Sequence, residues 1–347
     1  MNEKKERIIL DVAYQPQVRT NIDTRRLMLS VILALLPSVG VAVWQFGLHT
    51  LVVIAASVLS AVFFEWAMRK LRKQSNTIGD LSAVVTGLLL ALTLSPSIPW
   101  WVPVIGSFFA IVVVKQLYGG IGKNFLNPAL AGRAFLLASY AVIMARFPAP
   151  AHLAGVEGVD AFTAATPLNL LKNGGEMIFP LKSMFLGLIP GAMGEISALA
   201  LLLGGLYLIL RKVISWRIPV SFIGTVALLT LIFGGGGVSR VDFMLYNVLG
   251  GGLLLGAFFM ATDYATSPVT LKGQLLYGAG CGAITVLIRY FGSNAEGVSY
   301  AILLMNLCAW AIDKGFHRHQ FGVSKEDIQA EKDAKKKAKQ AAKEAAK

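Results

Sequence analysis

The sequence predicts an all-α integral membrane protein with about ten transmembrane helices. Of its 347 residues, 55% are hydrophobic and only 15% are charged, whereas an ordinary soluble domain is roughly a quarter charged. The mean hydropathy is +0.64. Charges this sparse cannot cover a water-facing surface, so the composition disfavours a soluble enzyme of two domains, which the length alone would suggest. The two cysteines are too few for a disulfide scaffold.

Each predicted helix is a run of residues with few or no charges. A spanning helix needs about 20 mainly apolar residues to cross roughly 30 Å of hydrocarbon. The runs that approach this length lie at 27–46, 48–68, 81–96, 100–114, 128–145, 191–210, 218–234, 243–262, 274–290 and 298–313. The stretch 81–114 is too long for one helix, and Pro96, Pro99 and Pro103 mark where it folds back.

The positions of the basic residues support this count independently. Lys and Arg near span ends concentrate on the cytoplasmic side of a membrane. With the N-terminus in the cytoplasm, 26 of the 32 Lys and Arg fall in inner segments and four fall in outer segments; Arg133 and Arg289 lie within runs. We therefore expect both termini in the cytoplasm. The net charge of +13 is explained by this bias, and we expect no nucleic-acid partner.

Five parts follow from this topology. We expect a cytoplasmic N-terminal segment (1–26), a first five-helix half (27–145), an outer loop (146–182), a second five-helix half (183–313) and a basic cytoplasmic tail (314–347). Thr-Leu-Ser-Pro at 93–96 is echoed by Ala-Thr-Ser-Pro at 265–268, five spans later. An odd offset would make the halves inverted repeats, which build sites from discontinuous helices near the midplane. A chance similarity of short segments is the alternative.

The outer loop contains the strongest candidate for a modification site. It reads Asp160-Ala-Phe-Thr163-Ala-Ala165-Thr166, followed by Pro167. From composition alone, a Thr-Pro turn of no special role would explain the segment. The spacing, however, resembles the acceptor motif of flavin transferases, D-x-x-[S/T]-G-A-T, in which the last Thr receives FMN through a phosphoester bond. Four positions match, and Ala164 stands where the motif usually has Gly.

The inner loop before the fifth run is rich in glycine. It reads Gly-Gly-Ile-Gly-Lys-Asn-Phe-Leu-Asn-Pro-Ala over 119–129 and lacks the Gly and Ser/Thr positions of a phosphate-binding P-loop. Asn124, Asn127 and Pro128 instead predict the start of a helix, because Asn caps helices and Pro suits their first turn. Arg133, about one turn later, is expected to reach the inner surface or to meet a phosphate or carboxylate.

Two carboxylates lie near the predicted membrane boundaries. Asp263, with Thr266 and Ser267, follows the eighth run, and a carboxylate near a bilayer is costly unless it pairs or meets water. These residues are candidates for an ion pathway or a flavin contact, and a salt bridge between Asp263 and Lys272 is the alternative. Glu195, at the edge of the sixth run, is expected to face water.

Taken together, these motifs resemble the NqrB/RnfD family of membrane subunits, which occurs in the Rnf complex and in the sodium-pumping NADH:quinone reductase. The resemblance rests on the flavinylation motif and on segments 119–129, 261–268 and 294–306. It implies a bacterial inner-membrane subunit that carries FMN on Thr166 at the outer side. It also implies coupling of electron transfer between ferredoxin and NAD to translocation of Na⁺ or H⁺.

The resemblance also implies partners and further cofactor contacts. The partners would be the other Rnf subunits, a flavin transferase for maturation, and membrane lipid. Asn124, Asn127 and Arg133 would border a flavin or a neighbouring subunit, and the presence of a second, non-covalent flavin such as riboflavin is left open. The chain has no dinucleotide fingerprint and no cysteine cluster. We therefore expect neither a catalytic residue nor a metal site.

Two other functions remain compatible with the sequence. Ten spans with a possible inverted repeat also describe a transporter or channel for a small solute, without flavin. Such a protein would be indifferent to loss of the Thr166 hydroxyl. A structural membrane subunit whose flavinylation motif is unused is the third alternative.

Overall fold

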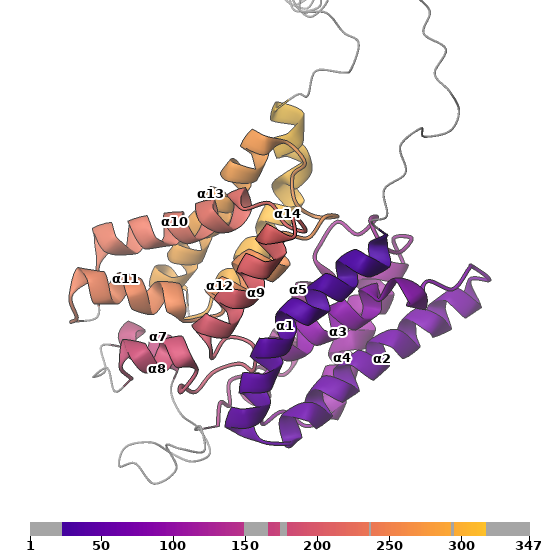
Figure 1. Cartoon of the computed structure of the whole chain (residues 1–347), viewed down its shortest axis with the longest axis horizontal. Helices are drawn as coiled ribbons and strands as arrows, with labels where there is room; N and C mark the ends of the chain where they lie inside the picture. Colours follow the sequence, from indigo (N-terminus) through magenta and orange to yellow (C-terminus); the bar gives the residue numbers. More distant parts are fainter. Residues whose placement is uncertain (1–22, 149–165, 174–178, 236, 293–294, 317–347) are drawn as a thin grey trace, which may run out of the picture.

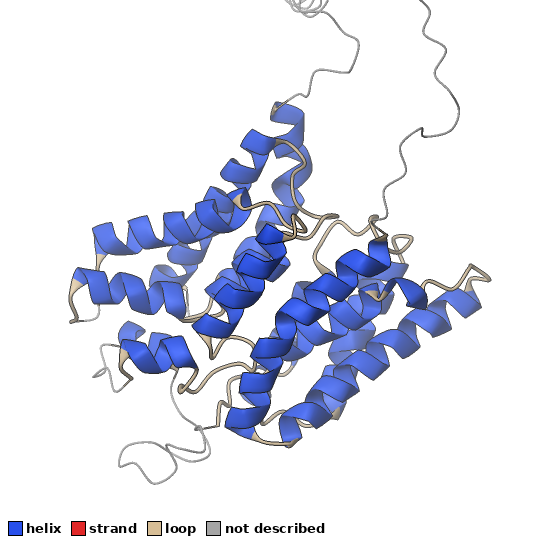
Figure 2. Cartoon of the chain, in the orientation of Figure 1, coloured by secondary structure: helices blue, strands red, loops and turns tan. Residues whose placement is uncertain are grey.

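The protein is all-helical in the computed structural model, which describes residues 23–148, 166–173, 179–235, 237–292 and 295–316 (Figures 1 and 2). Within these ranges there are helices, turns and loops but no strand. The elements are α1 (Thr24–Phe46), α2 (His49–Leu71), η1 (Ile78–Asp80), α3 (Ser82–Leu92), α4 (Trp101–Phe108), η2 (Phe109–Gln116), α5 (Pro128–Ser139), α6 (Ala141–Met144), α7 (Pro167–Lys172), α8 (Leu181–Leu186), α9 (Ala198–Leu210), α10 (Arg217–Phe233), α11 (Arg240–Leu249), α12 (Leu253–Leu255), η4 (Gly256–Met260), α13 (Leu271–Phe291) and α14 (Val298–Gly315). Each of the ten predicted runs overlaps at least one of these helices, which confirms the all-α fold.

The helices differ in how far they could reach across a bilayer. Among the described residues, α1, α2 and α13 are long and apolar enough to span it alone. Helix α11 and the α12–η4 segment pass the same test together but are bent by 56°. Helices α3, α9 and α10 and the α4–η2 segment are apolar but shorter. The structure thus agrees with a multi-pass membrane protein, and the count of ten crossings stays a prediction.

The structure corrects the extent of the third and sixth runs. Helix α3 has 11 residues and α9 has 13, so both are shorter than the runs 81–96 and 191–210 predicted. The non-helical segments beside them pair with each other: the Gly194 N–H donates to the Leu92 carbonyl at 2.7 Å and the Met193 N–H to the Leu94 carbonyl at 3.0 Å. Inside a membrane protein, backbone groups that leave a helix need partners within the protein. The paired segments supply these partners.

Glycine makes the break between α11 and α12 possible. Gly251 has a φ of +65° and Gly252 a φ of +67°, in the left-handed region that side chains disfavour. A Cβ atom at Gly251 would overlap the Leu168 side chain and lie 2.8 Å from Arg289 Nη2. The bend therefore brings the α11–α12 junction against α7 and α13.

Apolar side chains face outward and several polar ones face inward. Leu33 on α1 and Phe63 on α2 are exposed, whereas Ser57 on α2 is fully buried. The Ser57 hydroxyl donates to the Gly87 carbonyl of α3 at 2.7 Å. Close helix contacts through small residues and interhelical hydrogen bonds are typical of membrane helices, because lipid gives no hydrophobic drive for helix association.

The two predicted halves meet through equivalent elements. The first helix of each half, α1 and α9, pack together, and so do the last, α5 and α14. Figure 1 shows the end of α14 at the top of the view and the start of α1 at mid-height on the right, whereas α7 and α8 lie at the lower left. This arrangement is compatible with inverted halves, while the boundaries of the five parts stay predictions.

Candidate functional site

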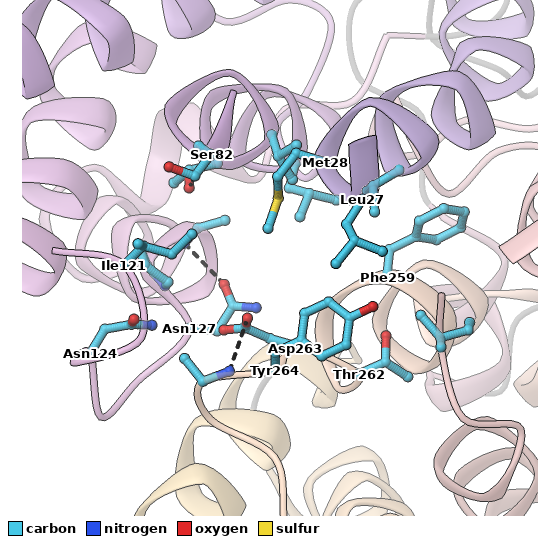
Figure 3. A pocket seen from close by; sticks show the side chains of 18 of the residues that line it. Leu27, Met28, Ser82, Ile121, Asn124, Asn127, Phe259, Thr262, Asp263 and Tyr264 are labelled. Atoms are coloured by element: carbon cyan, nitrogen blue, oxygen red, sulfur yellow. Dashed lines mark hydrogen bonds between the residues drawn. The ribbon is translucent and has the colours of Figure 1, made fainter. Parts of the chain in front are cut away.

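One cavity lies where α1 begins and α5 begins. This large pocket has a volume of about 430 Å³, within the size range of small-molecule sites. Leu27 and Met28 of α1 and Phe259 of η4 form apolar walls, and Asn127 and Asp263 lie close together on the opposite side (Figure 3). Its lining therefore combines broad apolar surface with a few polar groups.

Asn127 positions the start of α5, as the sequence predicted. Its Oδ1 accepts hydrogen bonds from the Ala129 N–H at 3.0 Å and the Leu130 N–H at 3.4 Å, and Pro128 is the first helical residue. Its Nδ2 donates to the Met260 carbonyl at 3.1 Å. The cap thus joins the first half to η4. Asn124 also lines the large pocket.

Asp263 is held by hydrogen bonds within its own turn rather than by an ion pair with Lys272. Its carboxylate accepts from the Ala265 N–H at 3.4 Å and from Thr266 Oγ1 at 3.2 Å, and the described ion pairs do not join it to Lys272. Burial raises the pKa of the Asp263 carboxyl, and these hydrogen bonds oppose the rise. Asp263 lines the large pocket, whereas Thr266 and Ser267 do not.

A buried ion pair borders the large pocket. Lys115 Nζ lies 2.8 Å from Glu65 Oε2 and donates to Ser82 Oγ at 2.6 Å. The two charged side chains are 3% and 1% exposed. From the sequence, Lys115 was predicted only as one of the inner-segment charges, and Glu65 was not among the candidate residues. The sequence did contain a signal for a functional or paired Glu65, since it is the only charged residue in the run 48–68.

Thr166 lies just before α7 and does not line the large pocket. It is buried, and its Oγ1 atom has no hydrogen-bond partner among the described residues. Together with Glu195, Gly250, Gly251 and Glu296 it lines a cavity of about 10 Å³, the Thr166 cavity. The other three motif positions, Asp160, Thr163 and Ala165, lie outside the described residues.

Four charged side chains from both halves gather beside Thr166. Arg133 Nη2 on α5 forms an ion pair with Glu296 Oε2. A carboxylate was one of the partners predicted for Arg133. Glu195 is 5% exposed, so the expectation that it faces water was wrong. It is buried because the non-helical segment before α9 folds inward against α3. Arg289 lies in the same region and donates to the carbonyls of Asn247 and Gly250.

A second cavity adjoins this group of charges. This small pocket, of about 240 Å³, is lined by Leu168 and Lys172 of α7, Asn247 of α11, and Arg289 and Tyr290 of α13, among others. Leu168 lines both the small pocket and the Thr166 cavity. The structure thus separates the predicted site residues into two groups. Asn124, Asn127 and Asp263 line the large pocket. Arg133 instead pairs with Glu296, which lines the Thr166 cavity.

Comparison with known proteins shows the family of the chain. A sequence model of the NQR2, RnfD, RnfE family matches residues 11–322. The chain belongs to this family. The family resemblance predicted from the motifs is therefore confirmed, and it covers nearly the whole chain.

The chain is similar to curated members of this family over almost their full lengths. Over 329 residues it is 47% identical to the D subunit of the Na⁺-translocating ferredoxin:NAD⁺ oxidoreductase complex of Acetobacterium woodii, covering 93% of this chain and 98% of that protein. It is 43% identical over 327 residues to the D subunit of the proton-translocating ferredoxin:NAD⁺ oxidoreductase complex of Clostridium ljungdahlii, covering 91% and 97%. It is 36% identical over 342 residues to the D subunit of the ion-translocating oxidoreductase complex of Salmonella arizonae, covering 88% and 96%.

Proposed function

We propose that this protein is the D subunit of an Rnf-type complex, which couples electron transfer between ferredoxin and NAD to cation translocation. The similarity to other D subunits over almost their full lengths carries this proposal. The cation is sodium or proton, because relatives at 47% and 43% identity are named for one and for the other. The same similarity favours a redox subunit over a solute transporter.

Within that complex, the chain would carry FMN esterified to Thr166. The motif supports this proposal, and so does the Thr166 Oγ1 atom, a buried hydroxyl without a partner among the described residues. The Thr166 cavity of about 10 Å³ has room for one water-sized group. A phosphodiester there therefore requires α7 to move away from Gly250 and Gly251. When bound, FMN supplies the redox chemistry, and the protein supplies position and electrostatics.

Nearby cations fit a phosphodiester and a flavin ring. Lys172 and Arg289 both line the small pocket, which begins beside Leu168, two residues after Thr166. Tyr290 and Phe243 add aromatic surface to it. We expect the basic groups to hold the phosphate, because charge-assisted hydrogen bonds to phosphate oxygens are strong.

The large pocket is our proposed site for a second, non-covalent flavin. Its apolar walls suit a flat aromatic ring, and Asn124, Asn127 and Asp263 offer hydrogen-bonding groups. Pockets that combine apolar lining with a few polar groups orient small ligands in this way. The two proposed flavins would lie at opposite ends of α9, because Glu195, just before α9, lines the Thr166 cavity and Leu208, near its end, lines the large pocket.

The sidedness of the chain is also part of the proposal. With the termini in the cytoplasm, as the charge distribution predicts, the large pocket opens near the inner surface and Thr166 lies near the outer surface. The bacterial inner membrane would be its location, and a flavin transferase, the other Rnf subunits and membrane lipid its partners.

In-gel flavin fluorescence tests the covalent flavin. The protein is co-expressed with a flavin transferase, denatured and compared with Thr166→Ala. A fluorescent wild-type band that is absent from the variant supports the proposal. Thr230→Ala is the matched control, because Thr230 is an equally buried threonine bonded within its own helix α10. A dark wild-type band, beside a bright control flavoprotein, would contradict the proposal.

A cavity-filling substitution tests the non-covalent flavin. Met28→Trp places a large side chain in the large pocket and should abolish the flavin that denaturation releases from Thr166→Val protein. Leu36→Trp on the same helix is the control, because Leu36 is 50% exposed and does not line the pocket. Equal flavin release from the two variants would remove the large pocket from consideration.

A further inference from the structure

The Thr166 cavity brings two glutamates together. Glu195 comes from the segment before α9 and Glu296 from the segment before α14, and both line this cavity. Because this cavity has a volume of only about 10 Å³, the two carboxyl groups that line it are close neighbours. Two carboxylates at this separation repel strongly in a buried site, and such pairs relieve the repulsion by sharing a proton.

One carboxylate oxygen of this pair accepts no hydrogen bond from the surrounding described residues. Glu195 Oε1 accepts a hydrogen bond from the Ala192 N–H at 2.9 Å. Glu195 Oε2 has no partner among the described residues, and Glu195 is only 5% exposed. A buried, ionised carboxylate with an unpaired oxygen is costly. A proton on one member converts the contact between the two glutamates into a hydrogen bond.

The nearby arginines do not neutralise both glutamates. Arg133 pairs with Glu296. The terminal nitrogens of Arg289 donate to backbone carbonyls of Asn247 and Gly250, which are neutral acceptors. Lys172, at the end of α7, is a further cation in this region, and its Nζ donates to the Gly292 carbonyl. The described ion pairs join none of these three cations directly to Glu195, although the charge of Arg133 also acts on it.

We propose that Glu195 and Glu296 hold one proton between them and form a proton-binding site beside Thr166. The unpartnered Thr166 hydroxyl lines the same cavity, and a volume of about 10 Å³ admits a single water as a carrier. The site joins the two halves of the fold, because Arg133 of α5 holds Glu296.

The site also responds to the charge on Thr166, a consequence that rests on the proposed flavinylation. An FMN phosphodiester adds one negative charge beside the pair. A nearby negative charge favours the protonated form of a carboxyl group. Esterification should therefore tighten the hold of the pair on its proton.

Infrared spectroscopy of the full-length chain tests the proton site without flavin. In Thr166→Val protein, the carbonyl band of a protonated carboxylic acid should be present at neutral pH. That band should disappear in a Glu195→Gln background, where the amide can donate to Glu296 and so replace the shared hydrogen bond. Glu65→Gln is the control that should leave the band unchanged, since Glu65 is paired with Lys115.

The outcomes separate the possibilities. An unchanged band in both Glu195→Gln and Glu296→Gln protein would overturn the proposal, as would a band that responds to sodium and not to pH. If Glu195→Gln protein does not fold, Glu296→Gln provides the same readout. A higher pH midpoint of the band in flavinylated than in Thr166→Val protein supports the coupling to Thr166, and equal midpoints refute that coupling. The comparison of infrared bands uses flavin-free Thr166→Val protein. It therefore tests the shared proton even if Thr166 proves not to carry FMN.

Discussion

The buried ion pair between Lys115 and Glu65 gives the sharpest prediction about stability. Lys115→Met removes the cation but keeps an apolar side chain of similar length. It leaves Glu65 almost fully buried, with Thr77 Oγ1 as its remaining donor at 2.8 Å. Removing one partner of a buried pair costs about 3–5 kcal/mol, because the other charge stays desolvated.

We expect the loss to be about 4 kcal/mol in the free energy of unfolding. Lys115 has two partners, Glu65 and Ser82, at 2.8 and 2.6 Å, and all three side chains are buried. The double variant Lys115→Met/Glu65→Gln removes both charges and should recover at least half of the loss, since a neutral replacement of a buried pair is often tolerated.

Denaturant unfolding of the purified protein in detergent micelles, followed by tryptophan fluorescence, measures these differences. Lys123→Met is the matched control, because Lys123 is exposed on the neighbouring loop and surface substitutions usually stay within about 0.5 kcal/mol. A loss below about 1 kcal/mol for Lys115→Met, or a double variant as unstable as the single one, would refute the reasoning from charge burial.

Three further predictions use the same unfolding assay. Asn127→Ala should cost about 1 kcal/mol through the lost cap, and Asn127→Ser should recover part of it; equal losses would argue against capping. Gly251→Ala should destabilise far more than Gly237→Ala, because both have positive φ but only the first Cβ would overlap a neighbour, Leu168. Because burial raises the pKa of Asp263, its contribution to stability is present below its ordinary pKa and is lost as pH rises through the raised value. Asp263→Asn should therefore gain stability over wild type with rising pH, and a pH-independent difference would contradict this.

Local signals along the chain predicted much of the fold. Apolar runs and the scarcity of charge determine an all-α membrane protein, because helices satisfy their own backbone hydrogen bonds in lipid. The helix start at Asn127 and Pro128 could also be predicted, because capping involves only neighbouring residues. The family resemblance was readable from four short segments in the correct order.

Other features were misread because their meaning depends on distant partners. Glu195 was expected to face water, and its burial follows from the pairing of the segment before α9 with the end of α3. Lys115 was counted as a loop charge, and its partner Glu65 lies 50 residues away. Arg289 was noted as a charge within a run, but its backbone acceptors on α11 could not be inferred.

The sequence by itself determined the fold class, the position of the membrane runs, the family and the candidate acceptor Thr166. Each of these depends on composition or on residues close together in the chain. The tertiary structure alone decided that Asn127 and Asp263 share one pocket and that Glu195 and Glu296 meet beside Thr166. Those contacts join residues 100 or more positions apart, and the packing of helices, rather than any local preference, sets which of them touch.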